Sequence, residues 1–378
     1  MAAVINTNVA SLNAQRNLSA SQNDLNTSLQ RLSSGMRINS AKDDAAGLAI
    51  ATRFTSQIRG LDVASRNAND GISLAQTAEG ALGEVTNNLQ RIRELAVQSR
   101  NATNSQTDRD ALNVEAQQLM SEINRVASST SFNGVKLLDG SFTNQSFQVG
   151  ANAGETIDIA SIVDASAANL GTYTRAEVTG VAATTFTAIA DGGVTINGTS
   201  VGAIAVATSA SERAGGFRDA VNSVSDTTGV YAINETSTTT TLVSSSGDIV
   251  LAGASATAAL VGIAAGTTTA ASATGFASLD ISSVGGADTA LQSMDAALEA
   301  VNTTRATLGA YQNRFSSVVA NLATQSENLS ASRSRIQDAD FAKETAALTR
   351  AQILQQAGTA MLSQANSAPQ NVMSLLRG

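Results

Sequence analysis

The sequence predicts a mainly α-helical chain that carries a smaller α+β insertion. Apolar residues recur at every seventh position in two long segments that contain no proline, which predicts helices with a buried face. Residues 165–277 lack this period and are rich in Thr, Ala, Ser, Gly and Val, which predicts the insertion. We therefore expect a discontinuous antiparallel helical bundle, or coiled coil, built from N- and C-terminal segments. A small β-hairpin region and an outer β-β-α-β-β module complete the predicted fold.

The composition narrows the chemistry that is available to the chain. Its 378 residues include no Cys and no His, which removes disulfides, thiolate nucleophiles, imidazole bases and the common zinc sites. The net charge of −8 lies in the middle, since residues 141–280 contain eleven acidic and three basic residues. A basic stripe for nucleic acid is therefore not expected. The carboxylate pair Asp43 and Asp44 lies at a predicted helix start, where capping explains it, so we expect no catalysis, cofactor or metal.

The first helix is predicted over residues 4–34. It is poor in charge, and an apolar face of this kind usually meets protein rather than water. Residues 1–15 contain no Lys or Arg and no long apolar run, so we expect no cleaved signal peptide and, from the whole sequence, no membrane span. The apolar positions of this helix are Leu18, Leu25 and Leu32, spaced by seven, with Leu29 on the neighbouring row.

The second helix is predicted to begin near Asp43 and to extend to about residue 100. Ser40 and Asp43 have the spacing of a capping box at its start. Apolar residues at every seventh position form a column along this helix, and a second apolar row lies beside it. Up to about residue 75 the second row lies three positions before the column, and beyond residue 82 it lies three positions after it, so it changes side near Gly80 and Gly83. This change predicts a break or stutter in the helix.

A third helix and a β-hairpin region follow. Thr107 and Asp110 predict a capping box, after which apolar residues continue at helical spacing to Val126. The segment 132–140 is predicted to form a turn and a short strand. Alternating apolar residues then flank a Gly-rich turn at 150–154, which predicts a hairpin.

The insertion is predicted to be a compact module. Val194 and Ile196 alternate into Asn197-Gly198, a strong signal for a two-residue hairpin turn. A short helix is predicted from Ser211, and further strands follow it. Residues 264–274 are predicted to be a loosely ordered linker that leads back to the helices.

The C-terminal part is predicted to be two helices. The longer one, residues 291–336, contains an unbroken apolar column whose partners we expect to be the helices between residues 43 and 126. The last helix, predicted over residues 338–365, has Leu354 and Met361 at sevenfold spacing. The column of the longer helix consists of Met294, Val301, Leu308, Phe315, Leu322, Leu329 and Ile336.

Several long motifs in the chain resemble bacterial flagellin. They are SSGMRINSAKDDAAGLAI at residues 33–50, LQRIRELAVQS at 89–99, FNGVKLLDG at 132–140 and the C-terminal run 339–376. The resemblance implies three regions. These are inner terminal helices at 1–42 and 345–378, a helical bundle with a β-hairpin at 43–164 and 278–344, and a variable outer module at 165–277.

The resemblance also implies a function. Such a chain is a structural subunit that self-assembles into the bacterial flagellar filament for motility. It is exported unfolded through the flagellar type III system and polymerised at the filament tip, so its expected location is extracellular. The implied partners are further copies of the chain, an export chaperone at the C-terminal helix, the filament cap and hook-associated proteins.

Two sets of residues are candidate contact sites. The first is a polymerisation seam on the charge-poor terminal helices, and the second matches positions at which many flagellins bind an animal innate immune receptor. For the second set, Arg91, Arg93 and Glu94 are equally consistent with a solvated helix face or with salt bridges inside the bundle. The seam is Leu18, Leu25, Leu29, Leu32, Leu354 and Met361, and the receptor set is Gln90, Arg91, Glu94, Leu95 and Glu115.

Two other function classes remain open from the sequence. A hook-filament junction protein, or another axial flagellar protein, would share the terminal helices but not these closely matched motifs. A soluble enzyme or binding module on a helical scaffold would need a convergent polar site, and the sequence offers none.

Overall fold

The computed structural model describes residues 7–234, 236–245 and 247–377. The chain divides into two compact units. The first contains the chain up to Ala68, Gln148–Thr156 and the chain from Ser317 onward. The second contains Asn69–Phe147 and Ile157–Ser316. The start of the first predicted helix, residues 4–6, lies outside the described residues.

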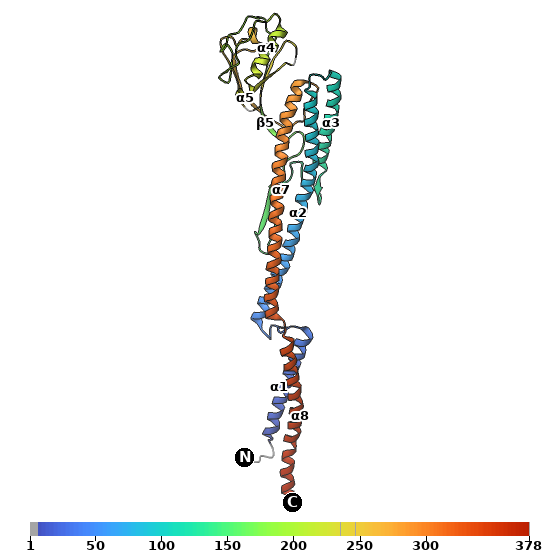
Figure 1. Ribbon diagram of the computed structural model, residues 1–378. Coiled ribbons are helices and arrows are strands. Elements are labelled where there is room, and N and C mark those ends of the chain that lie inside the picture. The colour runs from blue at the N-terminus through green and yellow to red at the C-terminus, as the bar shows by residue number, and fades with distance from the viewer. Residues whose placement is uncertain (1–6, 235, 246, 378) are drawn as a thin grey trace. The chain divides into compact units, whose positions relative to one another are not determined.

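Helices dominate the described residues, as the seven-residue period predicts (Figure 1). In the sequence, the strands all lie between the end of α3 and the start of α7. The mainly α fold with terminal helices that pack together and small antiparallel sheets in the middle is thereby confirmed. The helices are α1 (Val9–Ser34), α2 (Ala45–Ser99), α3 (Gln106–Ser129), α4 (Ala210–Asn222), α5 (Ser225–Thr228), α6 (Ala258–Val261), α7 (Val284–Gln337) and α8 (Phe341–Arg377).

The strands belong to four small sheets. β1 (Ser131–Phe132) pairs with β2 (Val135–Lys136), and β3 (Thr143–Gln148) pairs with β4 (Thr156–Ser161). The other two sheets have four strands each, in the orders β11-β10-β6-β7 and β12-β5-β9-β8. Their strands are β5 (Thr172–Thr179), β6 (Thr195–Ile196), β7 (Thr199–Ser200), β8 (Val230–Ile233), β9 (Thr241–Ser244), β10 (Ile249–Ala252), β11 (Gly266–Thr268) and β12 (Ala271–Thr274).

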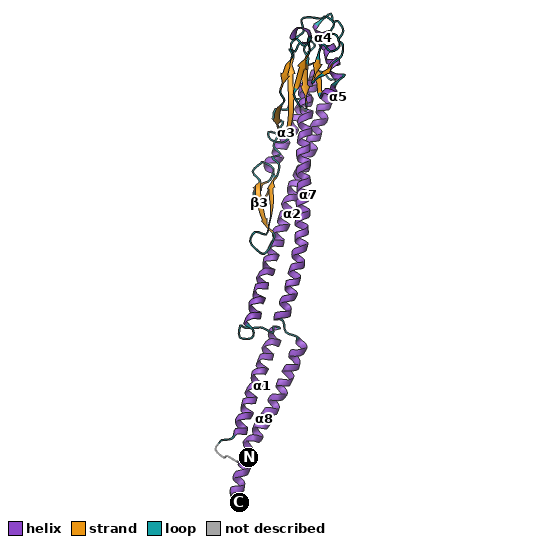
Figure 2. Cartoon of the chain, turned by 90° about the vertical axis from the view of Figure 1, so that its left-hand side faces the viewer, coloured by secondary structure: helices purple, strands orange, loops and turns teal. Residues whose placement is uncertain are grey.

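The apolar column of α7 is buried in the second unit from Met294 to Phe315, as predicted, whereas Leu329 and Ile336 in the first unit are only half-buried. Met294, Val301 and Phe315 are fully buried there, and α2 contributes Leu82 and Leu89, which are also fully buried. Figures 1 and 2 both show α2 and α7 side by side. We call this part of the second unit, α2 from Asn69, α3 and α7 to Ser316, the bundle.

One close contact fixes the spacing of α2 and α7 in the bundle. The Phe315 ring packs edge-on against Phe147, with ring centroids 5.6 Å apart and planes at 79°. A Cβ atom at Gly71 would lie 2.8 Å from Cζ of Phe315. Glycine at this position therefore lets the ring approach the helix backbone.

Both predicted capping boxes are wrong in position. The Asp43 carboxylate accepts hydrogen bonds from Ser40 N at 2.9 Å and from Asn39 N at 3.1 Å inside a turn. Asp44 instead caps α2, because its Oδ1 accepts from Gly47 N at 2.8 Å. At α3 the capping box is formed two residues earlier than predicted, by Ser105 and Asp108.

Of the break or stutter predicted near Gly80 and Gly83, the break is wrong, because α2 is continuous from Ala45 to Ser99. A glycine inside a helix costs about 1 kcal/mol relative to alanine. Leu82 and Val85 are fully buried beside these glycines, and burying a large apolar side chain contributes about 1.5 to 3 kcal/mol. The free energy gained by burying these side chains therefore outweighs the cost of the two glycines in the helix.

The insertion forms a compact body in which one apolar core connects both four-stranded sheets to α4. Its core includes Phe217 and Val221 of α4, Leu242 of β9, Ile196 of β6 and Leu251 of β10. The predicted Asn197-Gly198 hairpin is present as the β6–β7 turn, with both residues at positive φ. The module contains more strands than the sequence indicates, because β5, β11 and β12 are added.

The predicted linker at 264–274 is wrong, since this segment forms β11 and β12. β11 pairs with β10, and β12 pairs with β5. Both are edge strands of their sheets. An edge strand rich in Ser, Thr and Ala buries few apolar side chains, so the alternation that signals a strand is weak.

The first unit contains the terminal helices. α1 and α8 lie side by side in both views (Figures 1 and 2). Residue 8 contacts residue 365, and residue 31 contacts residue 344, so the two helices are antiparallel. We call α1 and α8 together the terminal pair.

Candidate interaction surfaces

The terminal pair buries very little apolar surface. The buried residues of α1 are Ser11 and Ser28, and among the described side chains of α8 the buried one is Ala351. Large apolar side chains remain in solvent instead, including Leu354 at 50% exposure and Met361 at 64%. Isolated exposed apolar residues are ordinary, but several on one helix pair with no core indicate a surface that another molecule covers.

The predicted seam residues divide into two groups in the terminal pair. Leu18, Leu25 and Leu32 are half-buried, and Leu18 lies against α8, because a Cβ at Gly358 would be 3.2 Å from its Cδ1. The other three, Leu29, Leu354 and Met361, are exposed. Three predicted positions are thus partly buried within the chain, and three are exposed.

Polar contacts fix the register of the terminal pair near its two ends. The Asn8 side chain caps α1 and donates to the Ala365 carbonyl at 2.8 Å. Ser11 Oγ donates to Asn366 at 2.7 Å, and Arg31 lies 3.9 Å from Glu344. The two hydrogen bonds contribute about 0.5 to 1.5 kcal/mol each, and the ion pair about 0 to 1 kcal/mol. The terminal pair is therefore positioned by polar contacts but weakly stabilised by them.

The second candidate surface lies on α2 and α3 in the bundle. Arg91 of α2 contacts Glu115 of α3 at 2.7 Å and Glu94 at 3.2 Å. These hydrogen bonds, first that to Glu115, raise the pKa of Arg91. The three side chains are about half exposed or more, so they form a charged face that a partner can reach.

Leu95 differs from the other members of the predicted receptor set. It is fully buried in the bundle core, whereas Gln90, Arg91, Glu94 and Glu115 are exposed. Arg93, on the same helix, contacts Asp295 of α7 at 2.6 Å. Arg91, through Glu115, and Arg93, through Asp295, therefore both make the bundle salt bridges that the sequence left open as an alternative.

A polar cluster that the sequence did not indicate lies where α7 begins. Asp288 is 4% exposed and contacts Arg100 at 2.5 Å. Burial raises the pKa of Asp288, although Arg100 and Arg175 act in the opposite direction. Tyr231 of β8 accepts a hydrogen bond from Gln292 at 3.0 Å, and burial raises its pKa to about 12. This cluster connects the outer module to α7, and no residue spacing marks it.

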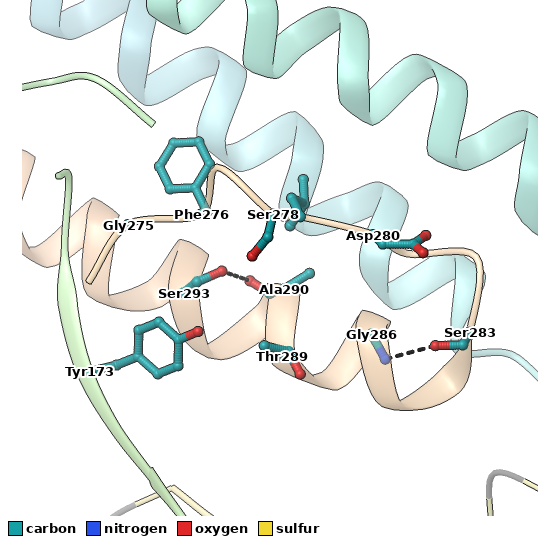
Figure 3. Close-up of a pocket in the computed structure, with 11 residues that line it drawn as sticks. Tyr173, Gly275, Phe276, Ser278, Asp280, Ser283, Gly286, Thr289, Ala290 and Ser293 are labelled. Atoms are coloured by element: carbon teal, nitrogen blue, oxygen red, sulfur yellow. Dashed lines mark hydrogen bonds between the residues drawn. The ribbon is translucent and has the colours of Figure 1, made fainter. Parts of the chain in front are cut away.

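A cavity of about 260 Å³ lies beside this cluster, between β5, the chain after β12, and α7 (Figure 3). Three of its hydroxyl groups have partners: Ser293 donates to the Ala290 carbonyl at 3.0 Å, Thr289 donates to the Gly285 carbonyl at 2.9 Å, and Ser283 accepts from Gly286 N at 3.0 Å. The Asp280 carboxylate accepts from Ser282 N at 2.9 Å. Among the residues that line the cavity, no nucleophile is paired with a base, so the cavity does not support catalysis.

Two further observations concern the described part of the chain. None of its helices is both long and apolar enough to cross a membrane. Nor does any group of three or more acidic side chains within it converge in a way that could hold a metal ion.

Comparisons with known proteins identify the family of the chain. Residues 5–143 match the family model of the bacterial flagellin N-terminal helical region, and residues 291–376 match that of the bacterial flagellin C-terminal helical region. The chain is 43% identical to B-type flagellin of Pseudomonas aeruginosa and 45% identical to flagellin A of Vibrio anguillarum. Each alignment covers 100% of both chains.

A solved structure of FliC from Burkholderia pseudomallei is 31% identical, with a TM-score of 0.40. The alignment covers 65% of this chain and 99% of that one. The two family models and the full-length relatives at more than 40% identity decide the assignment. The chain belongs to the bacterial flagellin family, whose members are structural subunits of the extracellular flagellar filament rather than enzymes.

Proposed function

We propose that the terminal pair is the part of this flagellin that joins copies of the chain in the filament. The observation that carries the proposal is the set of large apolar side chains that are exposed in the described parts of α1 and α8. Burying one such side chain against a neighbouring copy contributes about 1.5 to 3 kcal/mol. Ordering the helix backbone costs about 1 to 2 kcal/mol per residue, so the contacts of many neighbours are needed to stabilise it.

Deletion of either end tests this proposal. Removal of residues 1–42 or 345–378 is expected to abolish filaments seen by electron microscopy, because each deletion leaves the other helix of the terminal pair without a partner. The bundle core should survive both deletions, which circular dichroism of the soluble protein would check. Filaments of normal length and stability from either variant would contradict the proposal.

We also propose that the chain leaves the cell through the flagellar type III apparatus, with a chaperone bound to the C-terminal helix beforehand. The membership of the chain in the bacterial flagellin family supports this route. Secreted protein should retain its N-terminal residues by mass spectrometry and should disappear when the apparatus is inactivated. Secretion through the general pathway, with a cleaved leader, would contradict it.

The charged face of α2 and α3 is our proposed contact for an innate immune receptor. The exposure of Gln90, Arg91, Glu94 and Glu115 supports this role, whereas the buried Leu95 can act there only by supporting the helix. Arg91→Ala should reduce receptor signalling while the subunit stays folded. Arg93→Ala, which removes the salt bridge to Asp295 instead, is the matched control. Undiminished signalling by Arg91→Ala would contradict the proposal.

A further inference from the structure

Two Asn-Gly pairs in the chain have the same backbone conformation. Asn133-Gly134 joins β1 to β2, and Asn197-Gly198 joins β6 to β7. Both asparagines have φ of 49°, and the glycines have φ of 81° and 84°. These are the values expected for two-residue hairpin turns. The two pairs can therefore be compared by the contacts of their asparagine side chains.

Asn-Gly pairs can lose ammonia without an enzyme. The backbone nitrogen of the glycine attacks Cγ of the asparagine, the new C–N bond closes a five-membered imide, and the side-chain nitrogen leaves as ammonia. Water then opens the imide to aspartate or isoaspartate. Glycine favours the attack because no Cβ shields its nitrogen. The reaction also requires the asparagine side chain to rotate toward that nitrogen.

The side chain of Asn197 is held in place. Its Nδ2 donates to the Thr228 carbonyl at 3.0 Å, and its Oδ1 accepts from Val250 N at 2.9 Å. Its backbone N–H also donates to the Val250 carbonyl at 2.9 Å. Rotation of this side chain would break both of its hydrogen bonds at once.

The side chain of Asn133 has no such restraint. The residue is exposed, and none of the described residues forms a hydrogen bond with its side-chain amide group. We infer that Asn133 is a site of spontaneous deamidation, and that Asn197, in the same type of turn, is protected by Thr228 and Val250. Deamidation places a new negative charge in the β1–β2 turn, and the isoaspartate form also lengthens the main chain there.

Trypsin separates the two sites cleanly. Cleavage after Arg125 and Lys136 releases residues 126–136, and cleavage after Arg175 and Arg213 releases residues 176–213. Each peptide contains one asparagine, so its deamidated fraction, measured by mass spectrometry, reports a single site. Folded full-length protein, incubated at mildly alkaline pH and then digested, should show deamidation about tenfold or more faster at Asn133, as the loss of two ordinary hydrogen bonds implies.

The same incubation in urea provides the decisive control. Unfolding removes the hydrogen bonds of Asn197, so the two rates should converge, and Asn133→Gly should abolish the signal in its peptide while preserving the turn. Equal rates in the folded protein would overturn the inference. A difference that persists unchanged in urea would also overturn it, because the neighbouring residues rather than the fold would then set the rates.

Discussion

The terminal pair and the bundle carry similar seven-residue patterns but bury them to very different extents. In α7 the column from Met294 to Phe315 is almost entirely buried, whereas in α8 Leu354 and Met361 remain at least half exposed. The polar contacts of the terminal pair are sufficient to set its register but too weak to stabilise it. The bundle therefore has a buried core within one chain, whereas the proposed function has other copies of the chain complete the terminal pair.

The largest expected effect on the bundle comes from its central aromatic residue. Phe315→Ala should lower the free energy of unfolding by about 3 to 5 kcal/mol, because it leaves a cavity in a packed core. Urea unfolding of the monomer, followed by circular dichroism, measures this change. A loss below about 1 kcal/mol, typical of a surface position, would show that the bundle is not a self-sufficient core.

Two glycines of α2 provide a smaller and matched test. Gly71→Ala should destabilise the bundle by about 1 to 3 kcal/mol, since the new Cβ would collide with Phe315. Gly83→Ala should stabilise the bundle by about 0.5 to 1 kcal/mol, because no packed neighbour lies within 4 Å of the position that a Cβ would take. Thermal unfolding of both variants measures the two changes. Shifts of the same sign would contradict the packing described for the bundle.

Asp288 makes the stability of the bundle depend on pH. Burial raises its pKa, so the folded state binds the proton more tightly than the unfolded state does. The contribution of such a group is favourable below its ordinary pKa and is lost as pH rises through the raised pKa. As the pH rises from the ordinary pKa of Asp288 through its raised pKa, the unfolding midpoint of the wild type should therefore fall relative to that of Asp288→Asn. If the wild-type midpoint minus the Asp288→Asn midpoint stays constant or rises with pH, the ion pair with Arg100 outweighs burial.

The smallest effect on the monomer, and a large one on assembly, is expected in the terminal pair. Leu354→Gln combined with Met361→Gln should change the unfolding free energy of the monomer by no more than about 0.5 kcal/mol, because both side chains are exposed. The same variant should raise the protein concentration needed for polymerisation, measured by sedimentation. Normal polymerisation would exclude these two residues from the subunit contact.

Periodicity predicted the buried faces well but not the details decided by competing local contacts. The column from Met294 to Phe315 could be identified because tertiary packing and sequence period select the same residues. Ser105 with Asp108 and Thr107 with Asp110 have the same capping-box spacing, and contacts elsewhere select the first. Arg109 donates to the Ser99 carbonyl at 2.9 Å, which positions the start of α3.

The missed strands and the polar cluster could not be predicted from the sequence for a different reason. β12 is held by main-chain pairing to β5 at the edge of a sheet, so its side chains carry little signal. Asp288 is buried because residues from β5 and β8 approach it, and these strands are distant from it in sequence. The candidate sites show the same limit: resemblance identified the α2 positions, and the structure showed that Leu95 is in the core.

Amide hydrogen exchange of the monomer and the assembled filament tests the central claim most directly. Peptides from α1 and α8 should exchange quickly in the monomer and become strongly protected on assembly, because neighbouring copies then cover them. Peptides around Leu82 and Leu89 in α2 should be protected in both states. Terminal helices already as protected in the monomer as α2, with no gain on assembly, would contradict the claim that other copies complete them.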